Sequence, residues 1–360
     1  MKILYILNKS VLTGPNIVAL TNIEHIHDQG YDVSICFLNN GDDLNNIFPF
    51  LKEIEVFYLN LKSLGFISGL KNLNYYINSI KPTIIHSHCF LPDIYNIFNK
   101  FFCGPIKNKR VTTIHNIPKE DYRLRYGRIK GSLLLYFHKA LFPFFDNCIC
   151  ISKTVQKSIG IKKTSVIYNP VRDVFFNSTK DDVECLTIVY CGHFSQLKNP
   201  ITLIQLLADS KVNFQFLGIG DGPLLYQCRQ LVKKDPRFTF VGRVNHVHKF
   251  YEKANCLIHI SQTEGFCLSV AEALASNMYV ITNELPVFLE LKQALSSEGF
   301  YMLNDINNYN LEMVLNSINR KIEAGERCNS GASNRVKALL SPTFIAQQHI
   351  VLYQKLTVEK

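Results

Sequence analysis

The hydrophobic positions in the first half of the chain form short runs that are separated by longer mixed segments. Between these runs, Ile17–Gln29 and Leu70–Ile80 have helical spacing and stop before Gly30 and before Lys81-Pro82. Alternating strands and helices predict a parallel, doubly wound sheet with right-handed crossovers. The runs that we predict to be buried strands are Ile3–Leu7, Val33–Leu38, Thr83–His86, Val111–His115 and Asn147–Ile151.

The pattern then breaks and restarts. Asn169-Pro170 and the polar segment Asn177–Glu184 predict a linker. We therefore predict an α/β protein of two Rossmann-like domains, residues 1–177 and 178–341, whose ligands bind where the strands end at a shared cleft. Residues 342–360 should form a last helix, which could cross back to the first domain. The strands predicted in the second half are Leu186–Cys191, Asn213–Leu217, Phe238–Val241, Cys256–Ile260 and Met278–Ile281.

Composition supports a folded globular protein of the cytoplasm. The 360 residues suit two domains, and 47% hydrophobic against 19% charged residues excludes a disordered chain. No apolar run reaches 18 residues, and Ile3–Leu7 is too short for a signal peptide, so we expect neither a spanning helix nor secretion. The eleven cysteines show no repeated spacing, which argues against a disulfide framework or a structural zinc site. We expect reduced cysteines in the cytoplasm.

The net charge of +10 is concentrated in the first half, where 21 Lys and Arg residues face 12 Asp and Glu residues. Between Lys100 and Lys163 there are 14 bases and 3 acids, which favours an anionic partner such as a membrane, a phosphate-bearing substrate or nucleic acid. Bases alternate with aromatic residues over Tyr122–Lys130, and the apolar stretch Leu133–Phe145 follows, as in interfacial membrane binding. A solvated basic face beside a buried helix is the alternative. No motif for binding RNA or DNA accompanies the bases, so no nucleic acid is expected.

The segment from Glu264 to Glu272 holds the most informative chemistry. It follows a predicted strand, passes Gly265, and opens a helix near Ser269. Free N–H groups at a helix start favour a phosphate, which the backbone at a glycine can approach closely. Glu264 could then accept hydrogen bonds from sugar hydroxyls and Glu272 from a ribose. The alternative is that Ser269 and Glu272 form a capping box and that Glu264 is an ordinary loop carboxylate.

This segment resembles the Glu-x7-Glu signature of the retaining GT-B glycosyltransferases of family 4, with Cys267 in place of the last glycine of the loop. The match implies a GT-B fold and sugar transfer from a nucleotide-diphosphate sugar. Further segments resemble the family's motifs in the same order along the chain. These are Leu12-Thr13-Gly14-Pro15, Pro82–His88, Thr113–Asn116, Ile149–Ser152, Val166–Val171, Tyr190–His193 with Lys198-Asn199, and Phe216–Pro223.

The resemblance also implies roles for individual residues. Glu264, Lys198 and His115 would be catalytic: Glu264 holds sugar hydroxyls, Lys198 neutralises the leaving diphosphate, and His115 faces the transferred sugar. His193 stands where the family usually has arginine. His86 and His88 share one face of a strand, but no third ligand is evident, so we expect no metal there. The implied donor-binding residues are Gly14, His193, Lys198, Gly218, Gly220, Arg243, Glu264, Gly265, Phe266, Cys267, Leu268, Ser269 and Glu272.

The expected activity is retaining, metal-independent transfer of a sugar, with a UDP-sugar among the candidate donors. The absence of an Asp-x-Asp motif agrees with metal independence. The acceptor would be a saccharide or lipid-linked oligosaccharide of bacterial surface polysaccharide (capsule, O-antigen or lipopolysaccharide), and the basic region 100–163 would contact the anionic inner face of the cytoplasmic membrane. Two alternatives stay open at this point. One is a nucleotide-sugar 2-epimerase of the same fold, and the other is a non-catalytic carbohydrate- or membrane-binding relative.

Overall fold

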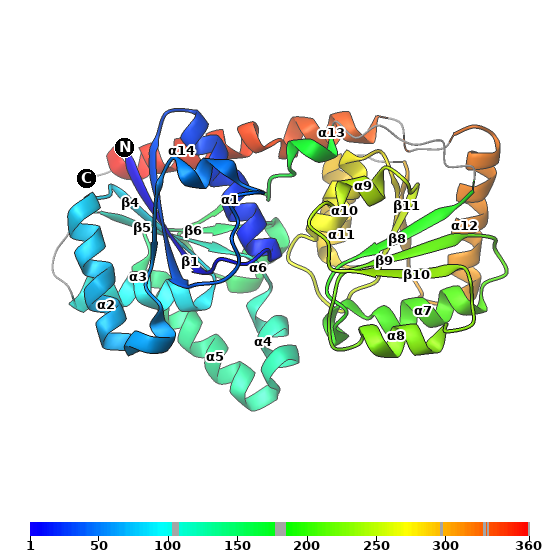
Figure 1. Ribbon diagram of the computed structural model, residues 1–360, viewed down its shortest axis with the longest axis horizontal. Coiled ribbons are helices and arrows are strands. Elements are labelled where there is room, and N and C mark those ends of the chain that lie inside the picture. Colours follow the sequence, from blue (N-terminus) through cyan, green and yellow to red (C-terminus); the bar gives the residue numbers. More distant parts are fainter. Residues whose placement is uncertain (103–107, 177–184, 296–297, 327–328, 330, 359–360) are drawn as a thin grey trace. The chain divides into compact units, whose positions relative to one another are not determined.

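The chain consists of two compact α/β units (Figure 1). A computed structural model describes residues 1–102, 108–176, 185–295, 298–326, 329 and 331–358. The first unit comprises Met1–Pro170 together with Pro342–Lys360, and the second comprises Val171–Ser341. Among the described residues, no helix has the length and apolar character needed to cross a membrane.

The first unit is built on a seven-stranded parallel sheet with the order β3-β2-β1-β4-β5-β6-β7. Alternate residues of β1 enter opposite cores, because successive side chains of a strand point to opposite faces. Ile3, Tyr5 and Leu7 pack on one face and Leu4 and Ile6 on the other. The strands are β1 (Lys2–Lys9), β2 (Asp32–Asn39), β3 (Glu55–Tyr58), β4 (Ile84–His88), β5 (Lys109–Ile114), β6 (Asn147–Cys150) and β7 (Thr164–Val166).

Helices cover both faces of this sheet (Figure 1). The core on one face includes apolar residues of α1 and of the chain's last helix, α14, whereas α2 and α3 contribute to the opposite core. Helix α14 thus belongs to the first unit although it follows the second in sequence. The helices are α1 (Gly14–Asp28), α2 (Leu61–Ile80), α3 (Phe90–Phe102), α4 (Pro118–Tyr126), α5 (Arg128–Leu141), α6 (Lys153–Ile159) and α14 (Pro342–Val358).

The second unit repeats the plan with a six-stranded parallel sheet of order β10-β9-β8-β11-β12-β13. Helices α7, α8 and α12 supply apolar side chains to its main core. The strands are β8 (Thr187–Cys191), β9 (Gln215–Ile219), β10 (Phe238–Gly242), β11 (Cys256–His259), β12 (Tyr279–Asn283) and β13 (Phe300–Leu303). The helices are α7 (Pro200–Asp209), α8 (Leu225–Leu231), α9 (His248–Tyr251), α10 (Leu268–Ala275), α11 (Pro286–Leu295), α12 (Asn308–Glu323) and α13 (Ala332–Leu340).

The predicted α/β class with two Rossmann-like sheets is confirmed, and all ten predicted strands occur within a few residues of their expected positions. Three short strands, β3, β7 and β13, were missed; each lies at an edge of its sheet and is only partly buried. The first unit ends at Pro170 and not at residue 177, so the turn Asp173–Phe175 belongs to the second unit. Most of the predicted linker, Asn177–Glu184, lies outside the described residues.

Candidate active site

The second unit has a topological switch point between β8 and β11. These strands are neighbours, yet the chain continues from β8 to β9 on one side and from β11 to β12 on the other. Loops at the carboxyl ends of such strands diverge and leave room for a ligand. The segment Gly192-His193 follows β8, and Ser261 to Glu264 follows β11. The fold itself therefore brings these two motifs together.

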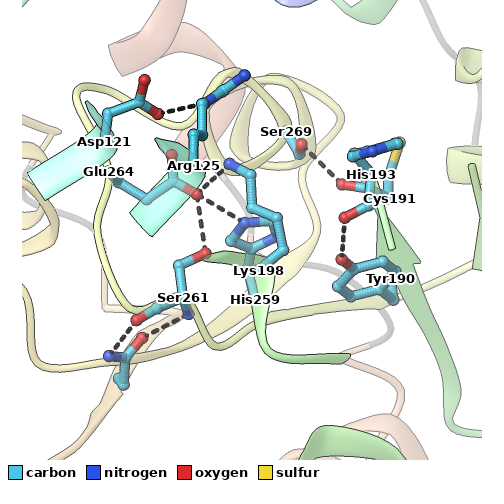
Figure 2. A network of polar contacts seen from close by, with 11 residues as sticks. Asp121, Arg125, Tyr190, Cys191, His193, Lys198, His259, Ser261, Glu264 and Ser269 are labelled. Carbon is cyan, nitrogen blue, oxygen red and sulfur yellow. Dashed lines mark hydrogen bonds and ion pairs between the residues drawn. The ribbon is translucent and has the colours of Figure 1, made fainter. Parts of the chain in front are cut away.

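Glu264 is the centre of the polar cluster at this point (Figure 2). Its Oε1 accepts hydrogen bonds from the Lys198 ammonium, from Ser261 Oγ at 2.8 Å, and from His259 Nε2 at 2.9 Å. Lys198 ends the short 3₁₀ helix η4 (Gln196–Lys198). Of the three catalytic residues expected from sequence, the structure joins Glu264 and Lys198.

The charges of this cluster are set by burial and by the Lys198 ammonium. Burial alone would raise the pKa of Glu264, but Lys198 and His259 outweigh burial and hold that pKa well below its usual value. Burial lowers the pKa of His259, and the neighbouring Glu264 offsets this in part. Glu264 is therefore an anion and His259 a neutral imidazole at physiological pH.

The loop after Glu264 leads directly into helix α10. Cys267 stands at the N-cap with φ +67°, a left-handed conformation that favours glycine, and its side chain makes no capping hydrogen bond. This conformation explains why the family pattern has a glycine there. The first N–H groups of α10 thus lack a side-chain cap, as a phosphate site requires.

The capping-box alternative for Ser269 and Glu272 is wrong. Ser269 lies inside α10, and its Oγ donates to the carbonyl of Cys191, at the end of β8, at 2.9 Å. Glu272 is buried, and burial raises the pKa of its carboxyl to about 8, although Arg172 opposes this shift. Glu272 is thus mostly protonated at pH 7 in the unliganded protein. Such a carboxyl is suited to a ligand that supplies hydroxyl groups.

The glycine turn after β9 packs against the segment after β8. Gly220 has φ +128°, and a Cβ there would lie 2.0 Å from the carbonyl oxygen of Gly192. A side chain at Gly220 would therefore push the two strand ends apart. Gly218, within β9, is also tightly packed, because an added Cβ would lie 2.8 Å from the ring of Phe240.

The remaining donor-site residues predicted for the second unit lie in or near the loops that follow its strands. His193 is exposed, and its Nδ1 lies 3.3 Å from Asp221 Oδ1. Arg243 is exposed and directly follows β10. In the loop into α10, Gly265 and Phe266 are buried, and Leu268, the first residue of the helix, is partly buried.

The first unit places its predicted residues at its own switch point, between β1 and β4. Gly14 starts α1, where an added Cβ would meet nothing within 4 Å, so packing does not require a glycine. His115 follows β5, and its Nε2 lies 2.8 Å from Nδ1 of His88. His86 binds Tyr353 of α14 and Thr113 of β5. Burial lowers the pKa of His115 to about 3, so these rings form a neutral cluster.

One group in the second unit has the residue types of a metal site. Ligand atoms of His259, Glu264 and Cys267 lie within 4.8 Å of one another. However, the Lys198 ammonium binds the same carboxylate, and burial raises the pKa of the Cys267 thiol well above its usual value. A cation would have to displace an ammonium group and deprotonate a buried thiol, so this donor set suits a metal poorly.

Sequence reasoning missed three members of the Glu264 cluster: Ser261, His259 and Asn283. His259 is the one strongly polar side chain in the otherwise apolar strand β11, and this exception was the available signal. Asn283, at the end of β12, accepts from Ser261 N–H at 3.0 Å and donates to the Ser261 carbonyl at 2.9 Å. No local pattern links Asn283 to Ser261, because the two residues meet only through the pairing of β11 with β12.

Two family models together match most of the chain. Glycosyltransferase Family 4 matches residues 12–174, and Glycosyl transferases group 1 matches residues 171–304. The O-antigen biosynthesis glycosyltransferase WclY of Escherichia coli is 26% identical over 310 residues, which cover 81% of this chain and 82% of that protein. An N-acetylgalactosaminyltransferase of Campylobacter jejuni, named for an undecaprenol-diphosphate-linked saccharide, is 25% identical over 156 residues, covering 41% of this chain and 43% of that protein.

Solved structures show the same fold at lower identity. Anabaena Alr3699/HepE, in complex with UDP and glucose, superposes with a TM-score of 0.80 at 17% identity and covers 99% of this chain and 100% of that chain. Sucrose-phosphate synthase from Thermosynechococcus elongatus gives a TM-score of 0.83 at 17% identity, with both chains fully covered. With these matches and the geometry above, the chain belongs to the GT-B glycosyltransferases of group 1 and family 4.

Proposed function

We propose that this glycosyltransferase transfers a sugar from a nucleotide-diphosphate donor with retention of anomeric configuration and without a metal ion. The observation that carries the proposal is the anion Glu264, held by Lys198 beside the uncapped start of α10 at the switch point of the second unit. An oriented carboxylate, a fixed cation and free N–H groups are the groups that a sugar diphosphate needs.

Each part of the donor has a matching group in the second unit. The α10 N–H groups and Lys198 suit the diphosphate, on which negative charge grows as it leaves. Glu264 suits the hydroxyls of the transferred sugar, and the protonated Glu272 suits a ribose. UDP is our first candidate for the nucleotide, since the similar Anabaena structure binds it.

The decisive experiment measures nucleotide released from a panel of UDP-, GDP- and ADP-sugars. We expect Glu264→Ala and Lys198→Ala each to lower turnover by about 100-fold or more, because each removes a group that acts on the transition state. Lys253→Ala, an exposed lysine outside the site, is the control and should stay active. Near-normal turnover in both site variants would refute the site assignment. Recovery of an epimerised nucleotide sugar would favour an epimerase instead.

Metal independence and retention need separate measurements. Turnover should persist in EDTA, and added Mg²⁺ or Mn²⁺ should change it little, because Lys198 supplies the positive charge that a metal otherwise brings. Once an acceptor is found, proton NMR of the product should show the anomeric configuration of the donor. Loss of activity in EDTA that added metal restores would contradict the first expectation.

We place the enzyme in bacterial surface polysaccharide synthesis, acting on a lipid-linked acceptor at the cytoplasmic face of the membrane. The names of the relatives support this class of acceptor. The α4–α5 hairpin supports contact with anionic lipid, since no acid occurs between Asp121 and Asp146. Its exposed side chains combine apolar residues with bases, namely Leu124, Tyr126, Ile129, Leu133, Tyr136 and Phe137 with Arg123, Arg125, Arg128 and Lys130.

Buried contacts join the two helices of this hairpin and fix α5 to helix α3. Tyr122 OH and His138 Nδ1 are 2.7 Å apart, and His138 Nε2 lies 2.8 Å from the buried Asp93 of α3. The exposed apolar side chains take no part in these buried hydrogen bonds. In vesicle sedimentation, Tyr136→Asp should reduce binding to phosphatidylglycerol vesicles. Tyr309→Asp, at an equally exposed tyrosine of α12, should not. Equal loss of vesicle binding in the two variants, or equal binding of the wild type to neutral vesicles, would exclude this surface as the membrane contact.

A further inference from the structure

The hydrogen bonds that reach Glu264 from the described residues all end on one of its two oxygens. Lys198, Ser261 and His259 donate to Oε1. A carboxylate oxygen has about two lone-pair sites, so three donors saturate it. A sugar hydroxyl that approaches Glu264 must therefore use Oε2. The cluster thus decides which oxygen of the carboxylate is presented to a ligand.

The surroundings of His259 determine its tautomer. Glu264 is an acceptor-only anion, so the His259 Nε2 that faces it carries the proton. Nδ1 of His259 is buried and has no hydrogen-bond partner among the described residues. A bare nitrogen is tolerated there better than an unpaired N–H, and an imidazolium would bury an unpaired charged donor. His259 is therefore a neutral donor with its proton on Nε2.

Both neutral donors are rigidly held. The His259 ring stacks on Tyr190 of β8, with centroids 5.8 Å apart and planes within 7°. Two hydrogen bonds from Asn283 fix the backbone of Ser261. Lys198, by contrast, reaches Glu264 on a long, flexible side chain that is 27% exposed. Ser261 and His259 are thus held in place, whereas the Lys198 side chain can rotate.

We propose that His259 is a positioning residue that, with Ser261, holds Oε1 of Glu264, so that Oε2 meets the sugar while Lys198 turns toward the diphosphate. Without the neutral donors, a move of Lys198 toward phosphate would leave a buried carboxylate unpaired, which is costly. With them, one ammonium serves both the carboxylate and the leaving group. The inference rests on the proposed function, since it assigns His259 to the same donor site.

The kinetic test compares substitutions that keep or lose a donor at the Nε2 position. Glutamine places an amide N–H near that position, whereas asparagine is too short and leucine has no donor. With UDP-glucose, UDP-galactose, UDP-N-acetylglucosamine and GDP-mannose as probes, we expect His259→Leu and His259→Asn to lower kcat for nucleotide release roughly 10- to 100-fold. His259→Gln should retain most of the wild-type kcat. Binding of the free nucleotide, which has no sugar to meet Glu264, should change less than about twofold in all three variants.

The outcomes separate a positioning role from a structural one. A residue needed only for folding would lower the unfolding temperature without separating kcat from nucleotide affinity. Wild-type kcat in both His259→Leu and His259→Asn, or equal loss in His259→Gln and His259→Asn, would overturn the proposal. Should His259→Leu fail to fold, the glutamine and asparagine pair still decides.

A second measurement needs no activity. In ¹⁵N-histidine NMR of the wild-type protein at pH 7.5, His259 should show a protonated Nε2 and a bare Nδ1, and its pKa should lie below the usual 6.5. A protonated Nδ1 at pH 7.5, or a pKa above 6.5, would overturn the proposal whatever the enzyme does. If the tautomer is as expected but the wild type turns over no nucleotide sugar, the proposed function fails, whereas the hydrogen bonds of His259 and Ser261 to Glu264 stand.

Discussion

The two units share a strand order but differ in the chemistry at their switch points. In both, the sheet runs outward from two central strands, β1 and β4 in the first unit and β8 and β11 in the second. The first unit fills the switch point with His86, His88 and His115, whereas the second holds an ion pair between Lys198 and Glu264.

The contrast shows how one fold supports opposite electrostatics. In the first unit burial dominates and lowers the pKa values of His86, His88, His115 and His349. Among the described residues, these rings form no hydrogen bond with a carboxylate. In the second unit the Lys198 ammonium outweighs burial and keeps Glu264 ionised. Strand order therefore sets where polar side chains gather, and the neighbours of each side chain set its charge.

The largest expected effect is an acid sensitivity that differs between the units. The folded first unit keeps its buried histidines neutral, whereas the unfolded chain protonates them below pH 6.5. The free energy of unfolding is therefore unaffected by these groups above pH 6.5 and falls as the pH drops below it. Between pH 6.5 and 5 each histidine should cost up to about 2 kcal/mol of stability. Hydrogen exchange of β4 should accelerate more than that of β12 on acidification. Equal acceleration in both strands would contradict the comparison.

Removing the Lys198 ammonium group should have the next largest effect. Lys198→Met removes the charged donor of Glu264 but leaves Ser261 and His259 in place, and should destabilise the protein by about 2 kcal/mol. The double variant Lys198→Met with Glu264→Gln should recover most of this loss, because it also removes the buried negative charge. Urea unfolding of both variants and of Glu264→Gln completes a double-mutant cycle. A coupling energy near zero would show that the ion pair does not stabilise the fold.

Glu272 should behave in the opposite way to Glu264. Its folded pKa of about 8 exceeds the unfolded value, so the folded protein binds the extra proton and loses stability as pH rises from about 4.5 to 8. Glu272→Gln should remove this slope and stabilise the unliganded protein at pH 8 by on the order of 2 kcal/mol. Thermal unfolding between pH 5 and 8 measures the slope. Glu272→Ala, which removes the hydrogen-bonding atoms that glutamine keeps, should bind nucleotide more weakly, and unchanged affinity would exclude a ribose contact.

The smallest effect is expected at Cys267. Glycine tolerates φ +67° better than cysteine does, so Cys267→Gly should relieve strain, offset in part by the loss of a buried side chain. We expect a gain in stability of less than about 1 kcal/mol. As a control, Cys228→Gly within helix α8 should be destabilising, because glycine disfavours a helix interior. A Cys267→Gly variant that loses as much stability would show that packing outweighs strain at this position.

Much of the fold and part of the site followed from local patterns. Apolar runs predicted ten strands, and the Glu264–Glu272 segment predicted a loop that leads into a helix. The short strands β3, β7 and β13 were not predicted; they are edge strands that are only partly buried. The capping box was a reasonable local interpretation, yet it failed because a residue of another strand, Cys191, accepts the hydrogen bond of Ser269.

The sequence by itself determined the fold class and the order of the motifs, because periodicity and motif spacing are local properties of the chain, and its resemblance to a glycosyltransferase family supplied the candidate pair Glu264 and Lys198. Only the tertiary structure decided that Lys198, His259 and Ser261 share one oxygen of Glu264, and that Glu272 is protonated while Glu264 is not. The reason is physical. Charge state and orientation depend on burial and on neighbours that strand pairing brings from distant positions, and no local pattern records those neighbours.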